Sequence, residues 1–414
     1  NYQVIPADRP EALQAVGGLL SYLYETQKNK LGHLRQLQYY ASGRFMELDL
    51  TARRNLELTE TLRSKEKRGS LLWVLDKTKT AMGARLLRKY IEQPLIDRTM
   101  IEERLEAVKE LKNNAISREE LREYLSPIYD LERLVGRISY QSANPRDLTA
   151  LKNSMDMLPP IKYLLEDMKS PLLARLCEEL DTLEELCKLV GDAICDEPPL
   201  AMKEGGIIRE GFNSDVDTLR NAKTEGKDWL AQLEADEREK TGIKNLRVRY
   251  NKVFGYYIEV TKSNLSQVPY RYLRKQTLAN CERYITEELK EMEDTILGAE
   301  EKRKTLEYEA FLKIRSILGN NIVRIQACAA RIALLDVLQS FACVAYENAY
   351  VRPEMTDDGI LDIRNGRHPV VESIRRQEFV PNDAFLDNDK SNMLLITGPN
   401  MAGKSTYMRQ AGLI

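Results

Sequence analysis

The chain has 414 residues, which is too long for one ordinary domain, and 30 % of them are charged. That composition excludes a membrane-embedded class, since no apolar run approaches the length that crosses a bilayer. Sixty-two Lys and Arg residues against 64 Asp and Glu residues give a net charge of −2, so the total charge alone does not indicate a nucleic-acid partner.

Cysteine usage favours a reducing compartment. The six cysteines form no CxxC pair, and the two histidines leave few soft ligands, which argues against zinc sites and a disulfide framework. No signal peptide opens the chain. We therefore expect a cytoplasmic protein without a membrane partner.

Helices are predicted for most of the first half of the chain. After a linker over residues 1–10, the region 11–211 shows helical patterns, and Asp97 is expected to cap one of them. The expected breaks are at prolines, namely Pro94, Pro127, Pro145, Pro159, Pro160, Pro171, Pro198 and Pro199. No catalytic constellation is recognisable, so we interpret the region as a helical scaffold.

Two long antiparallel helices are predicted next. The first, over residues 212–242, carries the apolar stripe Val216, Leu219, Gly226, Leu230 and Leu233. The second occupies 284–350, and its apolar residues follow the four-three spacing of a coiled coil: Ile285, Leu289, Met292, Ile296, Ala299, Leu306 and Ala310. A helix of about 60 residues would span about 90 Å at 1.5 Å per residue. The segment between the two helices is thus carried far from their base.

That intervening segment, residues 243–283, is a bounded basic patch. It holds nine basic and two acidic residues, a local charge of +7, whereas residues 284–309 hold nine acidic and four basic ones. Apolar and basic residues alternate at period two on both sides of a turn near Gly255, which predicts a β-hairpin with a cationic face. Such a face suits the phosphates of nucleic acid, and the alternative is a solvated sheet face.

The predicted nucleic-acid contacts combine the cations of this patch with neighbouring amide and hydroxyl groups. They are Lys244, Arg247, Arg249, Asn251, Lys252, Lys262, Ser263, Asn264, Arg271, Arg274, Lys275, Gln276 and Asn280. Six tyrosines cluster with them, and most of those rings are expected to pack rather than bind.

The final segment, residues 351–414, contains a phosphate-binding loop. An apolar run over 393–397 is predicted to be a strand, and it leads into Gly398-x-x-x-x-Gly403-Lys404-Ser405 and then a helix-compatible run. Lys404 would reach the β- and γ-phosphates of ATP or ADP, and Ser405 would bind Mg²⁺. The predicted nucleotide contacts of the loop are Gly398, Pro399, Asn400, Met401, Ala402, Gly403, Lys404, Ser405 and Thr406.

A nucleotide hydrolase also needs an acidic strand end that holds Mg²⁺ and a group that positions the attacking water. Neither follows Ile414, so we expect a truncated ATPase segment that is inactive by itself. The predicted fold class is mainly α. It combines a helical core, long antiparallel coiled-coil-like helices, a small β-rich tip and the first strands of a P-loop α/β domain.

Six stretches carry a family resemblance over essentially the whole chain. They are Asp49-Leu-Thr-Ala-Arg-Arg-Asn-Leu-Glu-Leu, Asp130-Leu-Glu-Arg-Leu, Asn144-Pro-Arg-Asp-Leu, Phe254-Gly-Tyr-Tyr-Ile-Glu-Val, and Gly366-Arg-His-Pro-Val-Val-Glu before Thr397-Gly-Pro-Asn-Met. In this order they closely resemble the MutS family of DNA mismatch-repair proteins.

The resemblance implies a role for each region. Residues 1–10 would end a connector, 11–211 form the core or lever domain, 212–242 the outgoing lever helix, 243–283 the clamp, 284–350 the returning lever helices, and 351–414 the truncated N-terminal part of the ATPase domain. The clamp would grip the backbone of duplex DNA without reading sequence. Gly366 to Pro369 would form a turn and a strand entry, and Phe379, with Val380 beside it, would stack on adenine.

The family further implies a homodimer, a MutL-type repair partner and a nucleoid-associated location. ATP binding would be coupled to opening and closing of the clamp. No segment matches the family's Phe-x-Glu mismatch wedge, so we expect this chain to lack mismatch specificity. Ala402 also stands where many members have a glycine, at an interior loop position that tolerates variation.

Three alternatives remain open from the sequence. A chromosome-architecture protein of the SMC type also joins a P-loop to a coiled coil, but there the loop precedes the coiled coil. MutS-related paralogues without a clamp are disfavoured by the basic insertion. A purely structural helical scaffold is the third, and binding of duplex DNA distinguishes it from a clamp.

Overall fold

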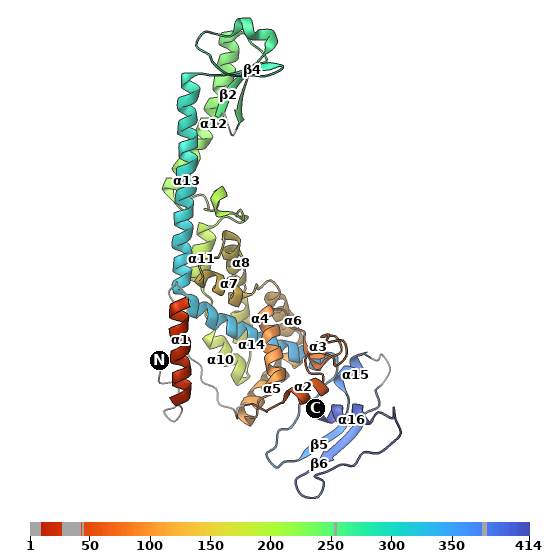
Figure 1. Cartoon of the computed structure of the whole chain (residues 1–414). Coiled ribbons are helices and arrows are strands. Elements are labelled where there is room, and N and C mark those ends of the chain that lie inside the picture. The colour runs from red at the N-terminus through yellow and green to blue at the C-terminus, as the bar shows by residue number, and fades with distance from the viewer. Residues whose placement is uncertain (1–9, 27–42, 44, 252–254, 375–378) are drawn as a thin grey trace. The chain divides into compact units, whose positions relative to one another are not determined.

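The structure is a computed structural model that describes residues 10–26, 43, 45–251, 255–374 and 379–414. The chain divides into two compact units (Figure 1). Unit 1 comprises residues 1–142, 150–184 and 319–414, and unit 2 comprises residues 143–149 and 185–318. The described residues are mainly helical and include two small antiparallel sheets, which confirms the predicted fold class.

Unit 1 is built largely from helices. They are α1 (Pro10–Thr26), α2 (Leu50–Asn55), α3 (Leu71–Leu75), α4 (Ala81–Glu92), α5 (Arg98–Asn113), α6 (Ala115–Leu125), α7 (Leu131–Ser139), α9 (Leu158–Glu166), α10 (Pro171–Glu179), α14 (Ile322–Glu347), α15 (Pro369–Ile374) and α16 (Lys404–Leu413). Its strands are β5 (Leu361–Gly366) and β6 (Asn382–Leu386).

The predicted helix boundaries in this half are confirmed where prolines set them. Helix α4 ends two residues before Pro94 and α6 ends two residues before Pro127, while α10 starts at Pro171 itself. Asp97 caps α5, because its side chain accepts a hydrogen bond from the backbone N–H of Met100.

Helix α14 is the centre of unit 1. It packs against α3, α4, α5, α6 and α7. By length and composition it is the one helix among the described residues that would suffice to cross a membrane, and 72 % of the window concerned is buried inside the fold. The expectation that no apolar run reaches that length is therefore wrong. The helix is apolar around much of its circumference because other helices surround it.

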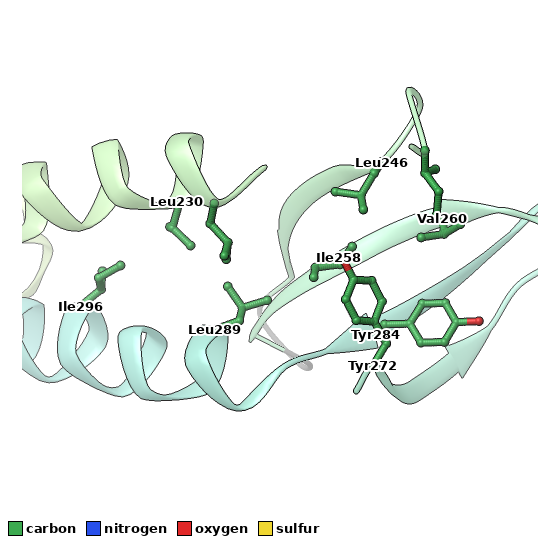
Figure 2. Close-up of a cluster of buried hydrophobic side chains, with 10 residues drawn as sticks. Leu230, Leu246, Ile258, Val260, Tyr272, Tyr284, Leu289 and Ile296 are labelled. Carbon is green, nitrogen blue, oxygen red and sulfur yellow. The ribbon is translucent and has the colours of Figure 1, made fainter. Parts of the chain in front are cut away.

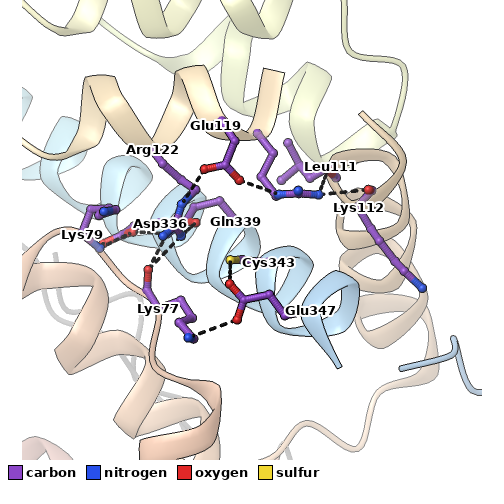
Figure 3. Close-up of polar contacts among 11 residues, drawn as sticks. Lys77, Lys79, Leu111, Lys112, Glu119, Arg122, Asp336, Gln339, Cys343 and Glu347 are labelled. Carbon is purple, nitrogen blue, oxygen red and sulfur yellow. Dashed lines mark hydrogen bonds and ion pairs between the residues drawn. The ribbon is translucent and has the colours of Figure 1, made fainter. Parts of the chain in front are cut away.

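A polar network ties α14 to the loop before α4 (Figure 3). The buried carboxylate of Asp336 accepts hydrogen bonds from the backbone N–H groups of Lys79 and Thr80 and from the Thr80 hydroxyl, at 2.7–3.1 Å. Gln339 donates to the same carboxylate at 2.7 Å, and Arg122 donates to the Gln339 side-chain oxygen at 2.7 Å. Because the carboxylate is satisfied on every side, burying it is tolerated and the loop is fixed.

Unit 2 contains the predicted antiparallel helices and the basic segment between them. Its elements are α11 (Glu184–Ala193), the 3₁₀ turn η2 (Met202–Glu204), α12 (Ser214–Thr241), β1 (Arg247–Asn251), β2 (Gly255–Thr261), η3 (Lys262–Gln267), β3 (Leu273–Thr277), β4 (Cys281–Ile285) and α13 (Glu287–Asn320). Helix α8 (Pro145–Met155) begins in unit 2 and ends in unit 1. Gly242, in the left-handed conformation, ends α12.

The predicted antiparallel seam exists between α12 and α13 (Figure 2). Leu230 and Leu233 of α12 and Leu289 and Ile296 of α13 belong to one buried cluster with the inner face of the sheet. Gly226 is needed at the crossing, because a Cβ there would lie 2.5 Å from Ile296 Cγ1. The seam therefore holds the two helices and the sheet in one body.

The prediction of one returning helix of about 60 residues is wrong. Helix α13 ends at Asn320 and α14 begins at Ile322, with Asn321 in a non-helical conformation. The run Gly319-Asn320-Asn321 has low helix propensity, which accounts for the break. Ile285, predicted as the first position of the seam, is instead the last residue of β4.

Two predictions for residues 351–414 are also wrong. Residues 393–397 form no strand, since they have no ladder partner among the described residues, and Met393 and Leu395 are 82 % and 89 % exposed. The stretch Gly366 to Pro369 is not a strand entry, because β5 ends at Gly366 and α15 begins at Pro369. Pro favours the first helical turn, where no intrahelical N–H is required.

Some predicted features lie outside the described residues. These are residues 1–9 of the linker, and Lys252 and Phe254 near the hairpin turn.

We predict that Gly226→Ala destabilises unit 2 by about 1–3 kcal/mol, because the added methyl group must displace Ile296. Gly298→Ala in α13 is the matched control. No atom lies within 4 Å of its added Cβ, so it should be neutral or stabilising by up to about 1 kcal/mol. Urea unfolding, followed by the fluorescence of Trp229 in a Trp73→Phe background, measures both. If both substitutions changed the free energy of unfolding equally, the close packing of α12 on α13 at Gly226 would be contradicted.

Candidate nucleic-acid interface and phosphate-binding loop

The loop before α16 has the backbone conformation that its glycines permit. Gly398 and Gly403 have φ values of +151° and +88°, and Met401 between them has +68°. Gly403 caps α16 directly. Residues Asn400 to Thr406 line a small open cavity of about 270 Å³. The first N–H groups of a helix lack intrahelical acceptors, so this cavity is suited to an anion.

Lys404 is folded back onto its own loop. Its Nζ donates hydrogen bonds to the carbonyl oxygens of Gly398 at 2.6 Å and Pro399 at 2.8 Å. Ser405 is exposed one residue later. An ammonium group and a hydroxyl group thus lie at the helix end where the sequence predicted them.

Contacts from β6 fix α16 in place. The Tyr407 hydroxyl donates to the carbonyl of Asp383 at 2.9 Å, and the Gln410 amide donates to that of Asn382 at 3.3 Å. Gln410 is 1 % exposed. Arg409 pairs with Glu57 at 3.0 Å. The cavity is therefore carried on an anchored helix rather than on a free chain end.

The predicted adenine contacts are not brought to this cavity. Phe379 is half-buried and Val380 is 76 % exposed, and neither lines it. Among the described residues, no group of three His, Cys, Asp or Glu side chains could hold a metal ion.

The basic segment folds as the predicted hairpin, extended into a four-stranded antiparallel sheet of order β1-β2-β4-β3, which we call the tip sheet. Arg247 pairs with Glu259, and Arg249 with Tyr257. Val248 and Ile258 point to the other face and pack on the seam cluster. The predicted alternation of a cationic and an apolar face is therefore confirmed for Arg247 to Arg249, whereas Tyr250 is exposed and Asn251 is half-buried, the reverse of the prediction.

One end of the tip sheet gathers several predicted contacts. The backbone N–H of Lys262 donates to the carbonyl of Asn280 at 3.1 Å, which joins the β3–β4 turn to the start of η3. Ser263 and Asn264 bond to the Thr261 hydroxyl at 3.1 and 3.4 Å in the same turn. Lys262, Ser263 and Asn280 are exposed.

Lys244, Arg247 and Lys262 are exposed cations of the tip sheet and its flanks, and none of them has a carboxylate within 4.0 Å among the residues that the structure describes. Cations without an internal counter-ion keep their full charge for an external anion.

Other predicted contacts are already engaged. Arg271 Nη2 donates to both oxygens of Glu237, at 2.7 and 2.6 Å, and the Tyr272 hydroxyl donates to Glu237 at 2.6 Å. Arg274 lies 3.7 Å from Glu282, which also accepts a hydrogen bond from Tyr284. These two arginines are therefore partly neutralised by the fold.

Both tyrosines are strongly perturbed by this arrangement. Burial, together with the hydrogen bond to Glu282, raises the pKa of Tyr284 to about 12. Burial and the bond to Glu237 likewise raise the pKa of Tyr272 well above its usual value. Both hydroxyls are therefore donors at physiological pH, consistent with the expectation that most rings of the cluster pack.

Three further predicted DNA contacts lie in different surroundings from one another. Lys275 is exposed and lies at an irregularity in the register of β3, and its charge acts on Glu293 of α13. Asn251 is half-buried. The Gln276 side chain accepts a hydrogen bond from Arg283 at 2.9 Å.

Sequence reasoning missed the carboxylate of Glu237 and the role of Arg283. A signal for Glu237 was available, since it continues the apolar stripe of α12 four residues after Leu233. A charged residue at such a seam position needs a buried partner. No comparable signal marks Arg283, because its neighbours Gln276, Tyr257 and Glu259 lie on the adjacent strands, and the register of strand pairing cannot be read from the sequence.

Comparison with known proteins identifies close relatives. The family described as MutS domain III matches residues 51–342. The chain is 57 % identical to the DNA mismatch repair protein MutS of Lachnoclostridium phytofermentans over 98 % of its length, 55 % to that of Alkaliphilus oremlandii over 97 %, and 56 % to that of Clostridium novyi over 96 %. It spans 44 %, 46 % and 44 % of those relatives, respectively.

We predict that Glu237→Ala destabilises the tip sheet by about 2–4 kcal/mol, since the buried Tyr272 hydroxyl loses its acceptor and Arg271 its counter-ion. Amide hydrogen exchange in β3 and β4 should accelerate accordingly. Glu239→Ala, on the exposed side of α12, should change the free energy of opening that exchange reports by no more than about 0.5 kcal/mol. Unaltered exchange in Glu237→Ala would show that this contact does not hold the sheet.

Proposed function

This chain belongs to the MutS family of DNA mismatch repair proteins, and from that premise we propose that its tip sheet binds the backbone of duplex DNA while its loop 398–405 binds ATP or ADP with Mg²⁺. The observation that carries the DNA proposal is the set of exposed cations without internal partners, Lys244, Arg247 and Lys262, beside exposed donors at one end of the sheet.

Backbone binding fits the residues better than base reading does. Lysine and arginine ammonium and guanidinium groups, with Ser and Asn side chains and backbone N–H groups, are the usual contacts to phosphate oxygens. The described tip sheet presents short strands and turns rather than a helix that enters a groove. We therefore propose binding that depends on salt and not on sequence.

The nucleotide proposal rests on the loop and its helix. Glycine φ values, the cavity at the start of α16 and the Lys404 ammonium together suit a polyphosphate. On binding, Lys404 would exchange its two carbonyl acceptors for phosphate oxygens, which carry more charge. Mg²⁺, held by Ser405 and the nucleotide, would neutralise the developing charge in hydrolysis by the longer protein.

Coupling between the two sites is also proposed, in line with the family. The chain leads from β4 directly into α13 and, after one residue, into α14, whose buried face forms the centre of unit 1. Nucleotide state would thus act on the clamp along these helices. A second copy of the chain and a MutL-type repair protein are the proposed partners, in a cytoplasmic, nucleoid-associated setting.

We predict that the triple substitution of Lys244, Arg247 and Lys262 by Gln weakens binding of matched and mismatched duplexes alike. The slope of log K against log salt should become shallower by about 2–3, since each lost phosphate contact contributes about 0.9. Fluorescence anisotropy over a salt series measures both quantities.

The matched control replaces Lys227, Lys302 and Lys313, exposed lysines of α12 and α13, with Gln. It removes the same charge from unit 2 but should leave the slope nearly unchanged. If the two triple variants behave alike, the tip sheet is not the DNA-binding surface.

We predict that Lys404→Ala lowers nucleotide affinity in the longer protein by at least about tenfold, because a charge-assisted contact to the phosphates is lost. Lys390→Ala, in an exposed loop of the same region, should bind nucleotide normally. Titration calorimetry with ADP and Mg²⁺ distinguishes them, and tight binding by Lys404→Ala would rule out the loop as the site.

A further inference from the structure

The outward face of the tip sheet holds one carboxylate among its arginines. The register places Arg247, Glu259, Arg283 and Gln276 in one row across all four strands. Arg249 Nη1 lies 3.7 Å from one oxygen of Glu259, and Arg283 Nε lies 3.9 Å from the other. Two guanidinium groups therefore lie near the oxygens of a single carboxylate, and Arg247 is its cross-strand neighbour.

These ion pairs are long and partly exposed. Their separations exceed the usual N–H···O range of about 2.7–3.2 Å. The side chain of Glu259 is 19 % exposed and that of Arg249 is 48 % exposed. Pairs of this kind contribute little to stability. A phosphate oxygen that approached to hydrogen-bond distance would be a better acceptor than Glu259 is here.

Arg283 does not need Glu259 to stay in place. Its Nη1 donates to the Gln276 side chain at 2.9 Å, and its guanidinium lies over the Tyr257 ring, 4.3 Å from the centroid. Its Nε is buried and has no hydrogen-bond partner in the described structure. Arg283 is therefore positioned by contacts other than the one with Glu259.

We propose that Glu259 is an internal competitor for the phosphates of duplex DNA, and that Arg283 and Arg249 are the cations it withholds. This inference rests on the proposed DNA-binding function and adds its regulation. In the free protein the carboxylate occupies the anion position of the row. DNA phosphates must displace this carboxylate from the arginines. The protein itself therefore limits the affinity of the tip sheet for a duplex of any sequence.

The test uses the full 414-residue chain and a fluorescent matched duplex over a salt series. Glu259→Gln keeps the size of the side chain and removes its charge. A unit charge about 6 Å from a phosphate changes affinity about threefold in water and about tenfold where the site is partly desolvated. We expect binding to tighten by that factor, with a slope steeper by about 0.9 for each phosphate newly contacted.

Three further variants and the wild type make the result decisive. Glu239→Gln removes the same charge from an exposed site on α12 and should gain far less. Glu259→Asp keeps the charge and should gain nothing. Glu259→Thr, which suits a strand, should gain as much as Glu259→Gln and serves as a second neutral variant if the latter does not fold.

A gain in Glu259→Gln and Glu259→Thr alone supports the proposal. An equal gain in Glu239→Gln or Glu259→Asp, or no gain at all while the wild type binds in a salt-dependent manner, overturns it and leaves the DNA-binding function standing. Absence of salt-dependent binding by the wild type overturns both.

Discussion

The tip sheet of unit 2 depends on the antiparallel pairing of α12 with α13. The four strands of this sheet, each five to seven residues long, have one apolar face that must be covered to exclude water. Leucine and isoleucine side chains from both helices complete its core, and Gly226 allows the helices to approach closely enough. The positions of the exposed cations therefore follow from the seam, although none of those cations takes part in it.

Buried carboxylates connect loops to helices throughout the molecule. Asp336 holds the loop before α4, and Glu237 holds Arg271 and Tyr272 against α12. Glu307 of α13 is fully buried and accepts hydrogen bonds from the backbone N–H groups of Gly206 and Ile207. Hydrogen bonds are directional, so such contacts fix a segment in one orientation, which apolar packing does less strictly. On the tip sheet they also divide the cations into structural and available ones.

Local sequence patterns predicted most helices and strands, but they could not predict which residues distant in the sequence pair with one another. The period-two alternation around Arg247 to Asn251 and the stripe of α12 gave the hairpin and the seam, because both depend on short spacings. The break between α13 and α14 at Asn321 was not predicted, because the apolar periodicity continues across it. Only the low helix propensity of Gly319-Asn320-Asn321 indicates it. Residues 393–397 have strand composition, but a strand exists only with a ladder partner. Charge counting found the basic patch, yet it could not tell Arg271, which is paired with Glu237, from Lys262, which has no such partner.

The central claim is that duplex DNA meets the tip sheet at the end where Lys262 and Asn280 come together. Hydrogen–deuterium exchange of the full chain with and without a matched duplex tests it directly. We predict slower exchange on DNA binding for amides in 261–264 and 277–283, and no change in α4 to α7. Protection confined to unit 1, with these turns unaffected, would contradict it.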